Sequence, residues 1–197
     1  MTETLTLTSG GANAIGPGKL VLVVGPSGAG KDTLLGLAKA ACADDPGIVF
    51  PRRTITRQAS ASEDNEEVSA GTFQEAVERG HFAVHWDAHG HRYALSRAID
   101  DDIRAGRTVV ANVSRTVIAK LRLAYADVVV VSITAPPNVL AERIALRARS
   151  SDGRLDRRLD RTVEDASAPD VTIVNVSSAE YHARQFVRIV KGEKWAE

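Results

Sequence analysis

The chain has 197 residues, and its 25 Lys and Arg residues balance 25 Asp and Glu residues. This length favours one α/β or α+β domain over two independent domains. A net charge of zero excludes a global basic field that would hold nucleic acid or an anionic membrane, so any anion site must be local. The single cysteine, Cys42, excludes an internal disulfide and, without a long apolar run or signal peptide, predicts a cytoplasmic protein.

Residues 1–18 are rich in Thr, Gly and Ala without a sustained period, and they predict a flexible N-terminal tail before a single domain at 19–197. From Lys19 onward, β-rich apolar runs alternate with helical patterns. Strands are expected at 20–24, 48–50, 108–113, 127–134 and 171–176, with helices at 31–43, at 114–125, from Pro136 onward and up to Lys191. Val- and Ile-rich strands separated by helices predict a central parallel sheet flanked by helices.

Two segments interrupt this alternation and contain the clusters of arginine. The first extends over about 52–96 and contains most of the histidines as well. The second, at about 147–161, is polar and is typical of a mobile flap. Planar guanidinium groups suit bidentate binding of phosphate, so both segments are candidates for contacts with phosphorylated ligands.

The sequence GPSGAGK at 25–31 lies directly between an apolar strand and a helix. Its glycines allow backbone N–H groups to surround phosphates, the following helix adds its positive N-terminus, and Lys31 would reach the β- and γ-phosphates. This pattern predicts a P-loop for a nucleoside triphosphate, with Lys31 as a catalytic residue. The expected phosphate-binding residues are Gly25, Pro26, Ser27, Gly28, Ala29, Gly30, Lys31, Asp32 and Thr33.

Asp32 occupies the position after the P-loop lysine, where Ser or Thr usually provides a ligand for Mg²⁺. The strand expected to supply a second acidic ligand ends without Asp or Glu, at 111–114. We therefore hypothesise that Asp32 is catalytic and binds Mg²⁺, directly or through water. The alternative is that its charge only stabilises the helix N-terminus.

The P-loop, the arginine-bearing insertion, the arginine-rich flap and the terminal strand VTIVNV together resemble the guanylate kinase family of nucleoside monophosphate kinases. The resemblance covers about 19–191. It implies that the insertion binds the acceptor, with Arg57 of TITR on the acceptor phosphate. It also implies that lid arginines, of which Arg147 and Arg149 are the first candidates, stabilise the transferred phosphoryl group.

The positions that read guanine in this family carry different residues here. Alignment on His89-Gly90 places the family's Glu at Val84, its first Tyr at Arg92 and its Ser or Thr at Leu95. A purine edge would lose its hydrogen-bonding partners at these positions, and unpaired buried polar groups are penalised. Guanine is therefore not the expected acceptor.

The segments GPSGAGKDTLL, RRTITR, HWDAHGHRYAL and VVANVSR resemble most closely one group within this family, the ribose 1,5-bisphosphate phosphokinases of phosphonate metabolism. The resemblance implies ATP-dependent phosphorylation of ribose 1,5-bisphosphate to 5-phosphoribosyl 1-diphosphate, with ATP and Mg²⁺ as cofactors. Such an acceptor is a small phosphorylated sugar that needs cations and hydroxyl-binding groups. The candidate acceptor-binding residues are Arg53, Arg57, His85, His89, Arg92, Tyr93, Asn112 and Arg115.

Several alternatives remain open at this point. The chain could be a nucleoside monophosphate kinase of changed base specificity, or a non-catalytic binding module of the same fold. His85, His89 and His91 could be metal ligands or could supply a general base. Phosphoryl transfer to a phosphate, however, needs no general base and depends on positioning and charge. Trp86 and Tyr93 could belong to the core or to the site. The sequence does not predict the oligomeric state.

Overall fold

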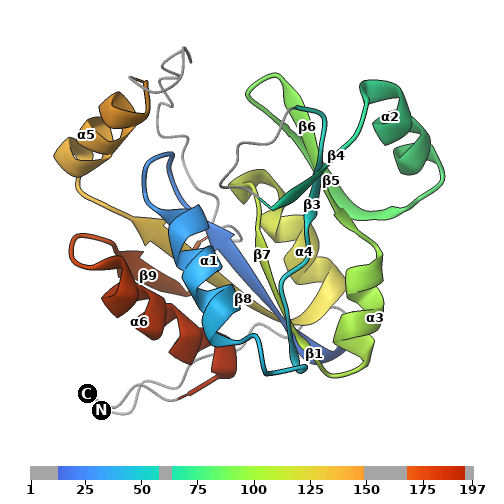
Figure 1. Cartoon of the computed structure of the whole chain (residues 1–197). Helices are drawn as coiled ribbons and strands as arrows, with labels where there is room; N and C mark the ends of the chain where they lie inside the picture. The colour runs from blue at the N-terminus through green and yellow to red at the C-terminus, as the bar shows by residue number, and fades with distance from the viewer. Residues whose placement is uncertain (1–12, 58–63, 149–167, 194–197) are drawn as a thin grey trace.

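The computed structural model describes residues 13–57, 64–148 and 168–193. Its central sheet is parallel throughout, with strand order β2-β7-β1-β8-β9 (Figure 1). This confirms the α/β class that the alternating pattern predicts. The strands are β1 (Ile15–Val24), β2 (Ile48–Val49), β7 (Thr108–Asn112), β8 (Tyr125–Thr134) and β9 (Val171–Val174).

Helices cover both faces of this sheet, so β1 is buried on both sides. Leu20, Leu22 and Val24 pack with α3 (Ala98–Arg104) and α4 (Ile118–Ala124), which follows the short 3-10 helix η1 (Arg115–Val117). Val21 and Val23 pack on the other face with α1 (Lys31–Ala41) and α6 (Ala179–Lys191). None of the helices in the described parts of the chain is long and apolar enough to cross a membrane.

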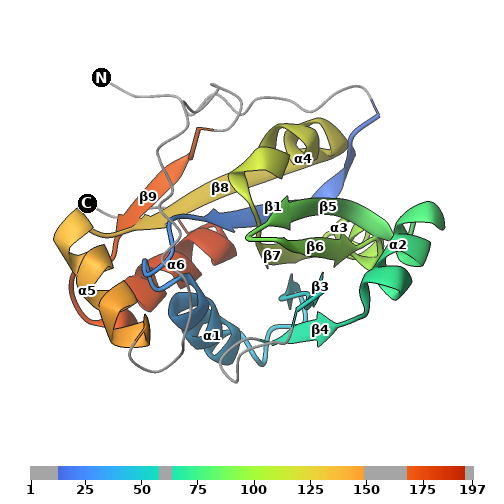
Figure 2. The same cartoon turned by 90° about the horizontal axis from the view of Figure 1, so that it is seen from above.

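A second sheet, in the order β4-β3-β6-β5, contains the strands of the segment at 52–96. It lies beside the parallel sheet and carries α2 at its outer end (Figures 1 and 2). Phe73 of α2 is fully buried, and its ring centroid lies 4.9 Å from that of Phe82. Its elements are β3 (Arg53–Ile55), β4 (Asn65–Glu67), α2 (Ala70–Glu78), β5 (Phe82–Ala88) and β6 (His91–Ser96).

The start of the domain differs from the sequence prediction. The predicted tail extends to residue 18, but β1 begins at Ile15, which pairs with Tyr125 at the start of β8. Gly16, Pro17 and Gly18 interrupt the apolar pattern and favoured a loop. Pairing with β8 and the packing of Ile15 against the core extend the strand in spite of these residues.

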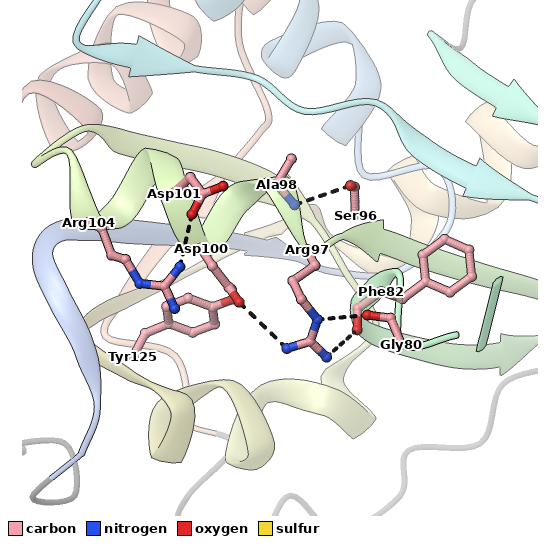
Figure 3. A network of polar contacts seen from close by, with 9 residues as sticks. All are labelled: Gly80, Phe82, Ser96, Arg97, Ala98, Asp100, Asp101, Arg104 and Tyr125. Carbon is pink, nitrogen blue, oxygen red and sulfur yellow. Dashed lines mark hydrogen bonds and ion pairs between the residues drawn. The ribbon is translucent and has the colours of Figure 1, made fainter. Parts of the chain in front are cut away.

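A polar network connects the second sheet to the core through α3 (Figure 3). Arg97 donates to the backbone oxygens of Gly80 and Phe82 at 2.7 and 3.1 Å, and its guanidinium lies 3.6 Å from Asp100. The buried hydroxyl of Tyr125 donates to Asp100 at 2.6 Å. Burial, with the Asp100 carboxylate as the second cause, raises the pKa of Tyr125, so this hydroxyl stays protonated at neutral pH.

Replacing Tyr125 with Phe should lower the free energy of unfolding by about 1–3 kcal/mol, because the buried Asp100 carboxylate loses a hydrogen-bond donor. Urea denaturation at neutral pH, followed by circular dichroism, measures this change. The matched control is Tyr181→Phe, whose side chain is exposed and which should change stability by less than about 0.5 kcal/mol. Equal effects of the two substitutions would contradict the role given to the network.

Candidate active site

The phosphate loop between β1 and α1 depends on glycines with positive φ. The φ angles of Gly25, Gly28 and Gly30 are 145°, 82° and 87°, in a region that strains residues with a Cβ atom. A Cβ at Gly25 would also collide with the backbone oxygen of Ile133 in β8. A Cβ at Gly30 would collide with the side-chain amide of Asn175, just after β9. Neighbouring strands therefore determine the shape of the loop.

Lys31 begins α1, and its ammonium group lies across the loop. Nζ donates to the backbone oxygens of Gly25 and Pro26, both at 2.9 Å. The ammonium group and the N-terminus of α1 thus share one end of the loop, where both attract phosphate. A cavity opens beside the loop. Of the predicted phosphate-binding residues, those that line it are Gly25, Ser27, Gly28, Gly30, Lys31 and Asp32, whereas Pro26, Ala29 and Thr33 do not.

Two residues outside the P-loop hold it from the side of β9. The buried side chain of Asn175 donates to the backbone oxygen of Ala29 at 2.8 Å. Arg143 of α5 (Pro137–Ala148) donates to the backbone oxygen of Asn175 at 3.1 Å and to that of Gly28 at 3.4 Å. The loop is therefore tied to α5 and to the end of β9, and the sequence pattern gave no signal for these contacts.

Asp32 faces the end of β7 rather than open solvent. The side-chain amide of Asn112 donates to Asp32 Oδ1 at 3.2 Å, and both residues line the cavity. In the described parts of the chain, no three His, Cys, Asp or Glu side chains form a group that could hold a metal. Mg²⁺ usually binds through one or two carboxylates together with phosphates and water. A single oriented carboxylate beside the P-loop fits that mode of binding.

A cavity of about 180 Å³ lies between the P-loop and the second sheet. The P-loop forms one side and the end of β7 forms another. The second sheet supplies cationic, aromatic and imidazole groups, which lie opposite the P-loop glycines. The lining residues outside the P-loop are Arg53, Arg57, Trp86, Ala88, His89, Tyr93, Asn112, Val113 and Ser114.

Tyr93 organises the arginines of the second sheet. Its hydroxyl accepts a hydrogen bond from Arg57 Nε at 3.3 Å, and the guanidinium carbon of Arg53 lies 5.9 Å from its ring centroid. Arg53 Nε also donates to the side chain of the buried Asn65 at 3.1 Å. Both arginines line the cavity. The site therefore places two cations opposite the P-loop, where an anionic acceptor would lie.

The structure brings other predicted residues to different places. His85 is exposed on the opposite face of β5 from Trp86, and its ring is nearly perpendicular to that of Phe73. Arg92 lies over the Phe73 ring, 4.6 Å from its centroid, and Arg115 is exposed at the start of η1; neither lines the cavity. The side chain of Arg147 and all of Arg149 lie outside the described residues.

Other cavity residues were not identified as site residues from the sequence. The sequence left Trp86 open between core and site, and it is both: only 7% of it is exposed, yet it lines the cavity. Val113 and Ser114 line it because they follow the carboxyl end of β7 beside the P-loop.

Cys42 lies at the end of α1, away from the residues that line the cavity. Burial raises the pKa of its thiol, as expected of an inert packing residue.

A parallel sheet with a P-loop after its central strand, and a cationic sheet facing that loop, defines a P-loop kinase fold. The family model described as guanylate kinase matches residues 17–188. The chain belongs to the guanylate kinase family. The crystal structure of guanylate kinase from Anaplasma phagocytophilum shares the fold, with a TM-score of 0.62 and 21% identity, over 92% of this chain and 87% of that one.

Relatives of much higher identity carry a more particular name. A ribose 1,5-bisphosphate phosphokinase PhnN from Bradyrhizobium diazoefficiens is 65% identical over the whole of both chains. A protein of the same name from Rhodopseudomonas palustris is 62% identical over 90% of each chain. These similarities confirm the resemblance noted in the sequence to this group of phosphotransferases.

We expect Asn175→Ala to raise the dissociation constant for ATP about tenfold, because the loop loses a buried hydrogen bond worth about 1–1.5 kcal/mol. Calorimetric titration with a non-hydrolysable ATP analogue measures the change. Thr172→Ala, an exposed substitution on the same strand β9, is the control and should leave the affinity unchanged. Equal affinities in both variants would show that Asn175 does not hold the loop in its binding conformation.

Proposed function

We propose that this chain transfers the γ-phosphoryl group of ATP to ribose 1,5-bisphosphate, giving 5-phosphoribosyl 1-diphosphate and ADP. The observation that supports this most directly is a cavity lined by the P-loop on one side and by two arginines on the other. Positions 84 and 95, where the resemblance places base-reading residues, carry no polar side chain. Val84 and Leu95 are 1% and 0% exposed and belong to the apolar core. The names of the full-length relatives support the same acceptor.

The reaction forms one bond and breaks one bond. An oxygen of the 1-phosphate attacks the γ-phosphorus, and the bond from that phosphorus to the bridging oxygen of ADP breaks. An anionic phosphate oxygen carries no proton that must be removed, so the chain's task is to align the two groups and offset their charge. Lys31, Arg53 and Arg57 all line the cavity. In this proposal Lys31 would contact the β- and γ-phosphates, and Arg53 and Arg57 would hold the acceptor.

Arg53 of this cavity has partners of a different kind from those of Arg104, Arg107 and Arg122. Within the described parts of the chain, Arg53 is held by the neutral groups of Asn65 and Tyr93. By contrast, Arg104, Arg107 and Arg122 are each paired with an aspartate. A guanidinium held by neutral groups keeps its full charge for a ligand phosphate. Two phosphate groups on one small acceptor need this kind of cation.

ATP and Mg²⁺ are the cofactors of this proposal. When bound, Mg²⁺ would neutralise charge on the β- and γ-phosphates. Asp32 is the residue that would hold it, directly or through water, and the hydrogen bond from Asn112 would orient the carboxylate. His89 would contact the sugar or its phosphate, and Arg147 and Arg149 would close over the transferred group. The cytoplasmic location and the absence of nucleic-acid and membrane partners remain predictions from composition.

The acceptor is tested by assaying ADP formation with ribose 1,5-bisphosphate, GMP, ribose 5-phosphate and other monophosphates in parallel. We expect turnover with ribose 1,5-bisphosphate at least about a hundredfold above GMP, because the buried, apolar Val84 and Leu95 offer a purine edge no hydrogen-bonding partner. Phosphorus NMR should identify the product as a 1-diphosphate. Turnover of GMP with none of the sugar bisphosphate would instead indicate a nucleotide kinase.

Replacing Asp32 with Ser should weaken the metal dependence of the enzyme. We expect the Mg²⁺ concentration for half-maximal activity to rise roughly tenfold, since a charged hard ligand is lost. The affinity of the ATP complex for Mn²⁺, measured by electron paramagnetic resonance, should fall in parallel and reports on the metal without turnover. The control is Asp44→Ser, an exposed carboxylate beyond α1. Unchanged metal affinity with Asp32→Ser would assign this residue to helix stability alone.

A further inference from the structure

Trp86 and Tyr93 form a stacked pair across the two antiparallel strands β5 and β6. They are direct partners in the strand register. Their ring centroids lie 5.8 Å apart, with 10° between the ring planes. Each is 7% exposed, and both line the cavity. The pair therefore forms an aromatic wall that joins the core of the second sheet to the acceptor side of the site.

The next pair on the same face of the two strands is Val84 with Leu95. Because side chains on one face recur every second residue, this pair lies directly beside Trp86 and Tyr93. Neither Val84 nor Leu95 lines the cavity, and both are buried in the same apolar cluster as the aromatic pair. The cavity thus ends at the Trp86–Tyr93 wall. These two apolar positions are two of the three at which the family resemblance places side chains that read a base; the third is Arg92.

The border of the aromatic wall is cationic. Arg57 donates to the Tyr93 hydroxyl, and the guanidinium group of Arg53 lies over the Tyr93 ring and is anchored to Asn65. A sugar phosphate carries anionic groups around a ring whose faces are largely C–H. Such a ring can pack on an aromatic surface while its phosphates contact the arginines. A planar purine would need additional depth in the direction that Trp86 closes.

We propose that Trp86 determines the acceptor specificity of this enzyme: its indole packs against the pentose ring and fills the space that a nucleobase would need. This inference rests on the proposed function, because it assumes that the cavity beside Trp86 holds the acceptor. Tyr93 holds the indole in place by stacking and holds Arg57 through its hydroxyl. Trp86 is thus a specificity residue that contacts the substrate, and Tyr93 is its positioning residue.

The first experiment compares Trp86→Ala and Trp86→Phe with the unmodified enzyme. In Trp86→Ala, kcat/KM for ribose 1,5-bisphosphate should fall about tenfold, and its ratio to kcat/KM for GMP should fall further, because stacking is lost and space is opened. Trp86→Phe should keep most of the selectivity. Asp87→Ala, an exposed substitution on the other face of β5, is the matched control. A selectivity ratio in Trp86→Ala within about fivefold of the unmodified enzyme overturns the inference.

The second experiment leaves Trp86 in place and is independent of whether the alanine variant folds. The chain has two tryptophans, Trp86 and Trp195, so Trp195→Phe makes Trp86 the sole source of indole fluorescence. Saturation with ribose 1,5-bisphosphate, without ATP, should shift or quench this emission, whereas GMP at the same concentration should not. Emission that stays unchanged at acceptor concentrations that saturate turnover overturns the inference.

The outcomes separate this inference from the proposed function. If the unmodified enzyme phosphorylates ribose 1,5-bisphosphate while either experiment at Trp86 gives the contrary result, the proposed function stands and the specificity role of Trp86 fails. If the unmodified enzyme phosphorylates GMP and not the sugar bisphosphate, the proposed function and the role of Trp86 both fail. In that case the aromatic wall admits a purine and does not exclude nucleotides.

Discussion

The close approach of strands β8 and β9 to the phosphate loop is the constraint on which the site depends. The backbone of Ile133 and the amide of Asn175 occupy the space where side chains at Gly25 and Gly30 would lie. The loop must therefore be glycine at these positions, and its backbone follows the surface of its neighbours. Once the loop has this shape, α1 begins at Lys31 and turns Asp32 towards Asn112 at the end of β7. Strand order thus determines both the anion site and its acidic neighbour.

The second sheet adds selectivity to this anion site through a different kind of interaction. Its cavity-facing side is an aromatic pair bordered by guanidinium groups, and the same residues that stabilise the sheet also form the wall of the site. The carboxylate-paired Arg97 connects this sheet to α3 and thereby to the core that carries β1 and β8. The position of the acceptor wall relative to the P-loop is therefore held by polar contacts at one end of the sheet and by packing along it.

The sequence predicted the parallel sheet and the P-loop well because both depend on local patterns. Runs of Val and Ile mark strands buried on two faces, and glycine spacing between a strand and a helix marks the loop. It predicted the acceptor side less well. Period-two alternation places His85 and Trp86 on opposite faces of β5, but only the packing of Phe73 and Val84 shows which face points to the cavity. The extension of β1 to Ile15 was missed because pairing with Tyr125 overrides a glycine- and proline-rich pattern.

The sequence by itself determined the fold class, the P-loop residues and the unusual carboxylate at Asp32, because each is encoded by neighbours along the chain. Only the tertiary structure decided which arginines share a cavity, that Asn112 orients Asp32, and that Asn175 and Arg143 hold the loop. The two residues of each hydrogen bond are separated by between 32 and 146 positions along the chain. Their pairing is set by strand order and by burial on folding, which no short segment of sequence specifies.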